Sequence, residues 1–244
     1  FDINATFAFT SLFTLTPDEL SGLPIDMMYD RLPYTRSALR DFRNGLFQGW
    51  SAPWARDMVK SRHEIGCHGV THTPWDCMDD EQAAFELSLV PLEVNQTFVF
   101  PRNRVGHLPL LARAGFKGYR CAPKARSRVR SLMSEFAILA SAEPFPPPAT
   151  PLSIPAGYFI NWRSGLRQVV PATVTRMRVR HILEDAVRTN GVAHFWTHPE
   201  NIASAPATAT NFRIVLEEAA RLRAEEGLVC LTQAQYCDHI TLQV

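Results

Sequence analysis

Two kinds of hydrophobic pattern alternate along the chain. Short runs of apolar, β-branched and aromatic residues are typical of buried strands, whereas apolar residues that recur every three or four positions are typical of amphipathic helices. Strands that alternate with helices predict an α/β fold with parallel strands. The predicted strands are residues 5–9, 63–68, 97–100, 118–120, 192–196 and 228–231, and the predicted helices are 36–47, 53–60, 79–94, 108–114, 176–190 and 211–226.

Helix-capping and turn residues mark the ends of several of these segments. Thr16-Pro17-Asp18-Glu19 predicts a helix start, because it combines an N-cap hydroxyl, a proline at the first helical position and two acids in the first turn. Gly115 and Gly227 directly follow predicted helices, where a left-handed residue commonly ends the helix. The proline-rich residues 144–155 predict an ordered, irregular connection within one domain.

Composition and charge narrow the class of protein. The chain has 244 residues, of which 46% are hydrophobic, and this is enough for one sizeable core. The net charge of +1 argues against a nucleic-acid-binding or membrane-surface protein. No apolar stretch is long enough to span a membrane. The five cysteines are scattered, and we interpret them as reduced thiols of a cytoplasmic protein, the alternative being one or two bridges in an exported protein.

Two histidines four residues apart, His68 and His72, are the first candidate for chemistry. Imidazole nitrogens at this spacing can meet one metal ion, as in other His-x3-His pairs that bind zinc. Gly66 and Gly69 allow the backbone to turn sharply after the predicted strand. The spacing alone is also compatible with two unrelated loop histidines.

The surrounding residues 62–72, Arg-His-Glu-Ile-Gly-Cys-His-Gly-Val-Thr-His, resemble the GHEIGxHxxxH segment of polysaccharide deacetylases, the NodB-homology group or carbohydrate esterase family 4. Residues 3–9, 98–101 and 194–199 are similar to three further motifs of that family, in the same order. The resemblance implies a distorted, incomplete (β/α) barrel that covers residues 1–244 as a single domain, here without its first strand. It also implies that His68 and His72 bind a divalent metal, most often zinc.

The resemblance further implies a metal-dependent hydrolase that removes an N-acyl group, such as acetyl, from an amino sugar in surface polysaccharide metabolism. His198 matches the family's general acid, and an imidazole exchanges a proton near neutral pH. The family's Asp-Asp motif, which supplies the catalytic base and the third metal ligand, has no counterpart before the strand at 5–9. We expect it upstream of Phe1; Asp76 and Glu200 are the nearest local carboxylates.

Candidate substrate contacts follow two of the predicted strands. Arg102, Asn103 and Arg104 come directly after the strand at 97–100, and guanidinium forks suit carboxylate or phosphate groups. Trp196 can stack on a sugar ring or pack in the core. The basic residues between 117 and 130 form a solvated face or recognise an anionic sugar, such as a nucleotide- or lipid-linked saccharide.

Two other functions remain open. One is a non-catalytic saccharide-binding protein that keeps the same fold, which the missing Asp-Asp motif would allow. The other is a related C–N hydrolase that acts on a small molecule or a formyl group, because one fold supports many substrates. A nucleic-acid partner is not expected, because the basic stretch lacks interleaved aromatic residues.

Overall fold

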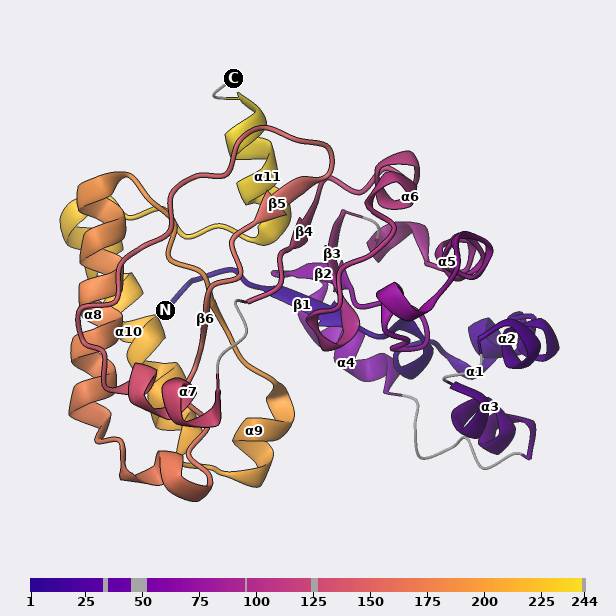
Figure 1. Cartoon of the computed structure of the whole chain (residues 1–244), viewed down its shortest axis with the longest axis horizontal. Coiled ribbons are helices and arrows are strands. Elements are labelled where there is room, and N and C mark those ends of the chain that lie inside the picture. The colour runs from indigo at the N-terminus through magenta and orange to yellow at the C-terminus, as the bar shows by residue number, and fades with distance from the viewer. Residues whose placement is uncertain (33–34, 45–51, 95, 124–126, 243–244) are drawn as a thin grey trace. The chain divides into compact units, whose positions relative to one another are not determined.

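A computed structural model describes residues 1–32, 35–44, 52–94, 96–123 and 127–242, and its elements are labelled in Figure 1. The chain divides into two units. The first unit comprises Phe1–Ile3, Pro123–Pro147 and Pro155–Cys230, and the second comprises Asn4–Ala122, Pro148–Ile154 and Leu231–Val244. The single domain expected over the whole chain therefore stays a prediction.

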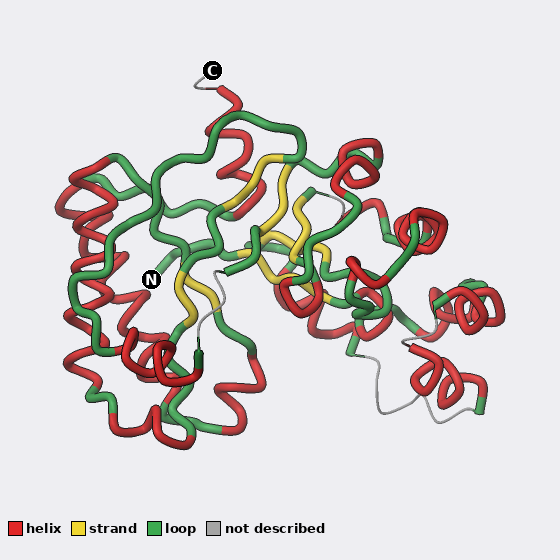
Figure 2. The backbone as a smooth tube through the Cα atoms, in the orientation of Figure 1, coloured by secondary structure: helices red, strands yellow, loops and turns green. Residues whose placement is uncertain are grey.

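The second unit is built around a parallel sheet (Figure 2). Among the described residues, five strands lie in the order β1-β2-β3-β4-β5, and every neighbouring pair is parallel. This confirms the α/β class with parallel strands. The strands are β1 (Thr6–Phe9), β2 (Glu64–Cys67), β3 (Thr97–Val99), β4 (Gly118–Arg120) and β5 (Leu152–Ile154).

Helices surround these strands in the sequence, and two of them begin at reciprocal caps. Thr16 accepts a hydrogen bond from the Glu19 amide while the Glu19 side chain accepts one from the Thr16 amide, as the sequence predicts. Asp79 and Gln82 form the same reciprocal cap. The helices of this unit are α1 (Pro17–Ser21), α2 (Ile25–Arg31), α3 (Arg36–Arg43), α4 (Pro53–Val59), α5 (Asp80–Ser88), α6 (Leu108–Arg113) and α11 (Gln233–Leu242).

The core of the second unit is aromatic at its centre. Trp75 packs edge-on against Phe98 at 4.7 Å between ring centroids, and Phe98 packs against Phe100 at 4.8 Å. All three side chains are buried, together with Cys67 and Leu111. Burial of these side chains stabilises the region where β2 and β3 end.

The first unit pairs two long helices with a short parallel sheet. Its helices are α7 (Arg128–Glu135), α8 (Ala172–Thr189), α9 (Pro199–Ser204) and α10 (Thr208–Glu226), and β6 (Tyr158–Phe159) pairs with β7 (Phe195–Trp196). Helices α8 and α10 lie side by side and share a buried apolar cluster that includes Leu183 and Leu222.

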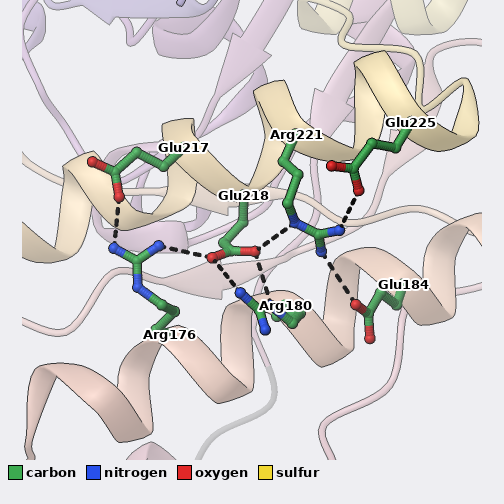
Figure 3. Close-up of polar contacts among 7 residues, drawn as sticks. All are labelled: Arg176, Arg180, Glu184, Glu217, Glu218, Arg221 and Glu225. Atoms are coloured by element: carbon green, nitrogen blue, oxygen red, sulfur yellow. Dashed lines mark hydrogen bonds and ion pairs between the residues drawn. The ribbon is translucent and has the colours of Figure 1, made fainter.

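Ion pairs also join α8 to α10 (Figure 3). Glu218 on α10 accepts hydrogen bonds from Arg176 and Arg180 on α8 and from Arg221 on its own helix. Burial raises the pKa of Glu218, but the hydrogen bonds from the three guanidinium groups outweigh burial and lower it to about 2. The Glu218 carboxylate is therefore charged and fully paired at neutral pH.

Several predicted elements differ from the structure. Residues 228–231 are not a strand but an irregular connection between α10 and α11. The helix predicted over 79–94 ends at Ser88, because Pro91 cannot continue it. The segments that form α7, β5 and β6 were not predicted as elements, because they are short and lie near the proline-rich connection. Residues 45–47 of the helix predicted at 36–47 lie outside the described residues.

All five cysteines are free thiols, and Cys67 and Cys237 are buried. In the part of the chain that the structure describes, no helix has both the length and the apolar character needed to cross a bilayer.

Candidate metal site

The two histidines lie in the loop that follows β2, at the edge of the sheet where the parallel strands end. The His68 amide donates to the Phe9 carbonyl, and the amides of Ser11 and Leu12 donate to the carbonyls of Gly69 and Val70. The backbone pairing of β1 with β2 therefore continues past both strands and holds the first half of the loop. In parallel α/β folds this edge is where ligands commonly bind.

The structure brings the two rings together, but in a loop and not on a helical turn. The ring centroids of His68 and His72 are 4.9 Å apart, and the ring planes meet at 65°. Gly69 and His72 both have left-handed backbone conformations, with φ of 76° and 60°. These two bends, and not helical periodicity, turn the second imidazole back toward the first.

A backbone carbonyl fixes the orientation of the His68 ring. The Nδ1 atom lies 2.6 Å from the carbonyl oxygen of Val99, at the end of β3. A carbonyl can only accept, so Nδ1 carries the hydrogen and the lone pair of a neutral ring is on Nε2. Histidines that bind metals commonly make this kind of contact with their second nitrogen. The donor set at this position therefore fits two ligands of a zinc-like ion.

Glu86 holds the backbone between the two histidines, and the sequence reasoning missed it. Its side chain is 0% exposed. Its Oε1 atom accepts from the amides of Val70 at 2.9 Å and Thr71 at 3.2 Å, and Oε2 accepts from the Thr71 hydroxyl at 3.0 Å. A signal was present in the sequence, because Glu86 lies three residues after Ala83 and so on the same face of its helix.

Glu64, at the opposite end of β2, has a structural role. Its carboxylate accepts from the hydroxyls of Thr6 and Thr97 and from the Ala234 amide. These bonds connect β2 to β1, β3 and α11, far from the carboxyl ends of the strands.

The predicted substrate-contacting residues after β3 have different environments. Arg102 is exposed, whereas Arg104 donates to Asp76 at 2.7 Å, which makes Asp76 an ion-pair partner. Asn103 accepts from Arg120 at 2.5 Å. Arg120 is 8% exposed, and this burial lowers its pKa to about 10. Arg120 is thus no part of a solvated basic face, while Lys124 and Arg126 of the same stretch lie outside the described residues.

Trp196 and His198 belong to the first unit, where they form an aromatic cluster with Phe159. Trp196 lies 4.7 Å from Phe159 and 5.5 Å from His198 between ring centroids. The His198 side chain is 50% exposed, and its Nδ1 is 3.7 Å from the Glu200 carboxylate. Four residues earlier, His194 contacts the Pro155 carbonyl at 2.7 Å, a structural role.

Within the described ranges, no three His, Cys, Asp or Glu side chains are grouped so that they could hold a metal ion. Metal binding by His68 and His72 therefore stays a prediction. No family model and no curated protein matches the sequence, so membership of the polysaccharide deacetylase family stays a prediction that rests on the motifs.

Proposed function

We propose that this protein is a metal-dependent hydrolase that removes an N-acyl group, such as acetyl, from an amino sugar. The observation that carries the proposal is the facing pair His68 and His72, with the Nδ1 atom of His68 bonded to the Val99 carbonyl. The two imidazoles suit zinc, and a zinc ion bound there would lower the pKa of a bound water and polarise the acyl carbonyl.

The remaining steps of the proposed reaction concern the acyl carbon and the sugar nitrogen. Water adds to the acyl carbon, the carbon–nitrogen bond breaks, and the sugar nitrogen takes up a proton as acetate leaves. We assign that proton to His198, because it matches the family's general acid and its half-exposed imidazole can be reprotonated by solvent.

The proposed substrate is a saccharide, with an anionic group in a nucleotide- or lipid-linked form. Arg102 is exposed beside the end of β3 and is available for a phosphate or carboxylate. The partly exposed rings of Trp196 and Phe159 offer a face for a pyranose ring. We further propose a cytoplasmic location and a distorted, incomplete barrel fold.

The test is acetate release from N-acetylated amino sugars, free and nucleotide-linked, by the full natural chain supplied with zinc. We expect release that a chelator abolishes and that zinc restores. Substitution His198→Gln should lower kcat by about 100-fold or more while KM changes little. The control is His181→Gln on α8, which should leave kcat unchanged. Absence of acetate release from every sugar tested would reject the proposal.

A non-catalytic saccharide-binding role is the second candidate, favoured by the aromatic cluster of Phe159, Trp196 and His198. Such a protein would bind N-acetylated sugars without hydrolysis. Trp196→Ala would then weaken saccharide binding. Neither added zinc nor a chelator would change that binding, and no acetate would be released. The same acetate assay, run beside a binding titration, therefore separates the two candidates.

A further inference from the structure

We infer that Glu86 is a positioning residue that sets the conformation of the His68–His72 loop before any metal binds. The part of the inference that concerns metal rests on the proposed function. The part that concerns the loop stands on the geometry of the metal-free chain.

The contacts of Glu86 are directed at the backbone halfway between the two histidines. Both carboxylate oxygens are used, one on the amides of Val70 and Thr71 and the other on the Thr71 hydroxyl. Together these hydrogen bonds satisfy two successive backbone amides and one hydroxyl of the loop. One side chain therefore determines the path of the segment that separates the two imidazoles.

Burying the Glu86 carboxyl group is energetically unfavourable, and this indicates that the side chain has a specific role. Burial raises the pKa of Glu86, and the hydrogen bonds from the Thr71 and Val70 backbone only partly counter this effect. The neighbours on the same face, such as Ala83, are apolar. An apolar side chain would satisfy packing at this position, but it would leave the two loop amides without their acceptor.

The backbone of Gly69 lies close to the same Glu86 carboxylate. Its φ of 76° is left-handed, and a Cβ atom at this position would lie 2.8 Å from the Oε1 atom of Glu86. A Cβ atom at position 69 would therefore force the Glu86 carboxylate out of its present position. The loop at Gly69 and the helix that carries Glu86 therefore pack closely against each other.

Two separate sets of hydrogen bonds consequently restrain the histidine pair. The Val99 carbonyl orients the His68 ring, and Glu86 fixes the chain that leads to His72. Ligands that are already oriented lose less conformational freedom when they bind a metal. Zinc affinity should therefore depend on Glu86 although this side chain is not itself a ligand.

The experiment compares Glu86→Leu with Glu64→Leu, because leucine accepts no hydrogen bond, and adds Glu86→Gln as the conservative variant that keeps an acceptor oxygen. Each leucine variant replaces a carboxylate that accepts three hydrogen bonds in the second unit, but Glu64 lies at the opposite end of β2. In metal-free protein, NMR reports the ring-to-ring contact of His68 and His72 and the tautomer of each imidazole. Isothermal titration with zinc then gives the metal affinity.

We expect Glu86→Leu to weaken the ring-to-ring contact and to lower zinc affinity by about 10- to 100-fold, the usual effect of residues behind metal ligands. Glu86→Gln should preserve most of both, because its amide oxygen still accepts from the two loop amides, and Glu64→Leu should change neither. If Glu86→Leu fails to fold, Thr71→Val replaces it, since it removes one of the three bonds, and the same readouts apply.

An unchanged ring-to-ring contact and unchanged tautomers in Glu86→Leu overturn the inference. If the wild-type chain binds no zinc, the proposed function fails, but the metal-free NMR comparison still decides the role of Glu86. If both leucine variants weaken the contact equally, Glu86 acts only through general stability, and the inference is rejected.

Discussion

At the scale of single residues, the chemistry-bearing side chains were easier to predict than those that position them. His68 and His72 stand out because imidazole is a rare side chain at a characteristic spacing. Glu86 is one of several acids in its helix, and only the structure shows that its carboxylate turns inward to two loop amides. The spacing of an acid does not reveal which backbone group it will meet.

Gly69→Ala is a residue-scale test of the fit between the loop and Glu86. Alanine costs about 1–2 kcal/mol at any left-handed position, and here its Cβ atom would also meet the Glu86 carboxylate. Gly115→Ala is the matched control, because Gly115 has φ of 85° and open space around it. Denaturant unfolding should show a larger loss of stability for Gly69→Ala; equal losses would contradict the close approach.

Buried thiols give a second prediction at this scale. Burial raises the pKa of Cys67 to about 12 and that of Cys237 to about 12. Because only the thiolate is reactive, both should resist a thiol reagent in the folded protein at pH 8 and react after denaturation. Mass spectrometry of labelled peptides checks this, and rapid labelling of Cys67 in folded protein would contradict its burial.

At the scale of elements, local sequence signals determined helix starts better than strands. The caps at Thr16 and Asp79 act within one turn, so each start was readable from a few neighbouring residues. Strands such as β5 and β6 are two or three residues long and depend on partners distant in sequence. Residues 228–231 are apolar enough for a strand but pair with no strand in the described part of the chain, which explains the wrong prediction.

The α8–α10 ion network predicts a pH dependence. The pKa of Glu218 is about 2 in the folded chain, below its ordinary value of 4.5. A lowered pKa contributes stability that is fully present above about pH 5 and is lost as the pH falls toward 2. From the size of this shift we expect the free energy of unfolding to fall by on the order of 2–3 kcal/mol over this range.

Glu218→Gln should remove most of this pH dependence, whereas Glu225→Gln should leave it almost intact. Glu225 makes one exposed pair with Arg221, and exposed pairs contribute about 0–1 kcal/mol. Urea unfolding at pH 3 and pH 7, followed by circular dichroism, gives the comparison. The same pH dependence in Glu218→Gln as in the wild type would show that other acids dominate.

At the scale of the whole molecule, the alternation of patterns was enough to predict an α/β fold with parallel strands. It was not enough to predict that the chain divides into two units, because the segments of each unit are discontinuous in sequence. The candidate residues divide in the same way: His68, His72 and Arg102 belong to the second unit, and Trp196 and His198 belong to the first. The order of motifs along the chain carries no information about this division.

Zinc stoichiometry tests whether His68 and His72 act together as ligands. Metal analysis of the full natural chain after dialysis against zinc should give one ion per chain for the wild type and for His239→Ala, an exposed histidine on α11. His68→Ala and His72→Ala should each lose that ion while remaining folded by circular dichroism. One tightly held zinc ion in both of these variants would contradict the assignment of the histidine pair as metal ligands.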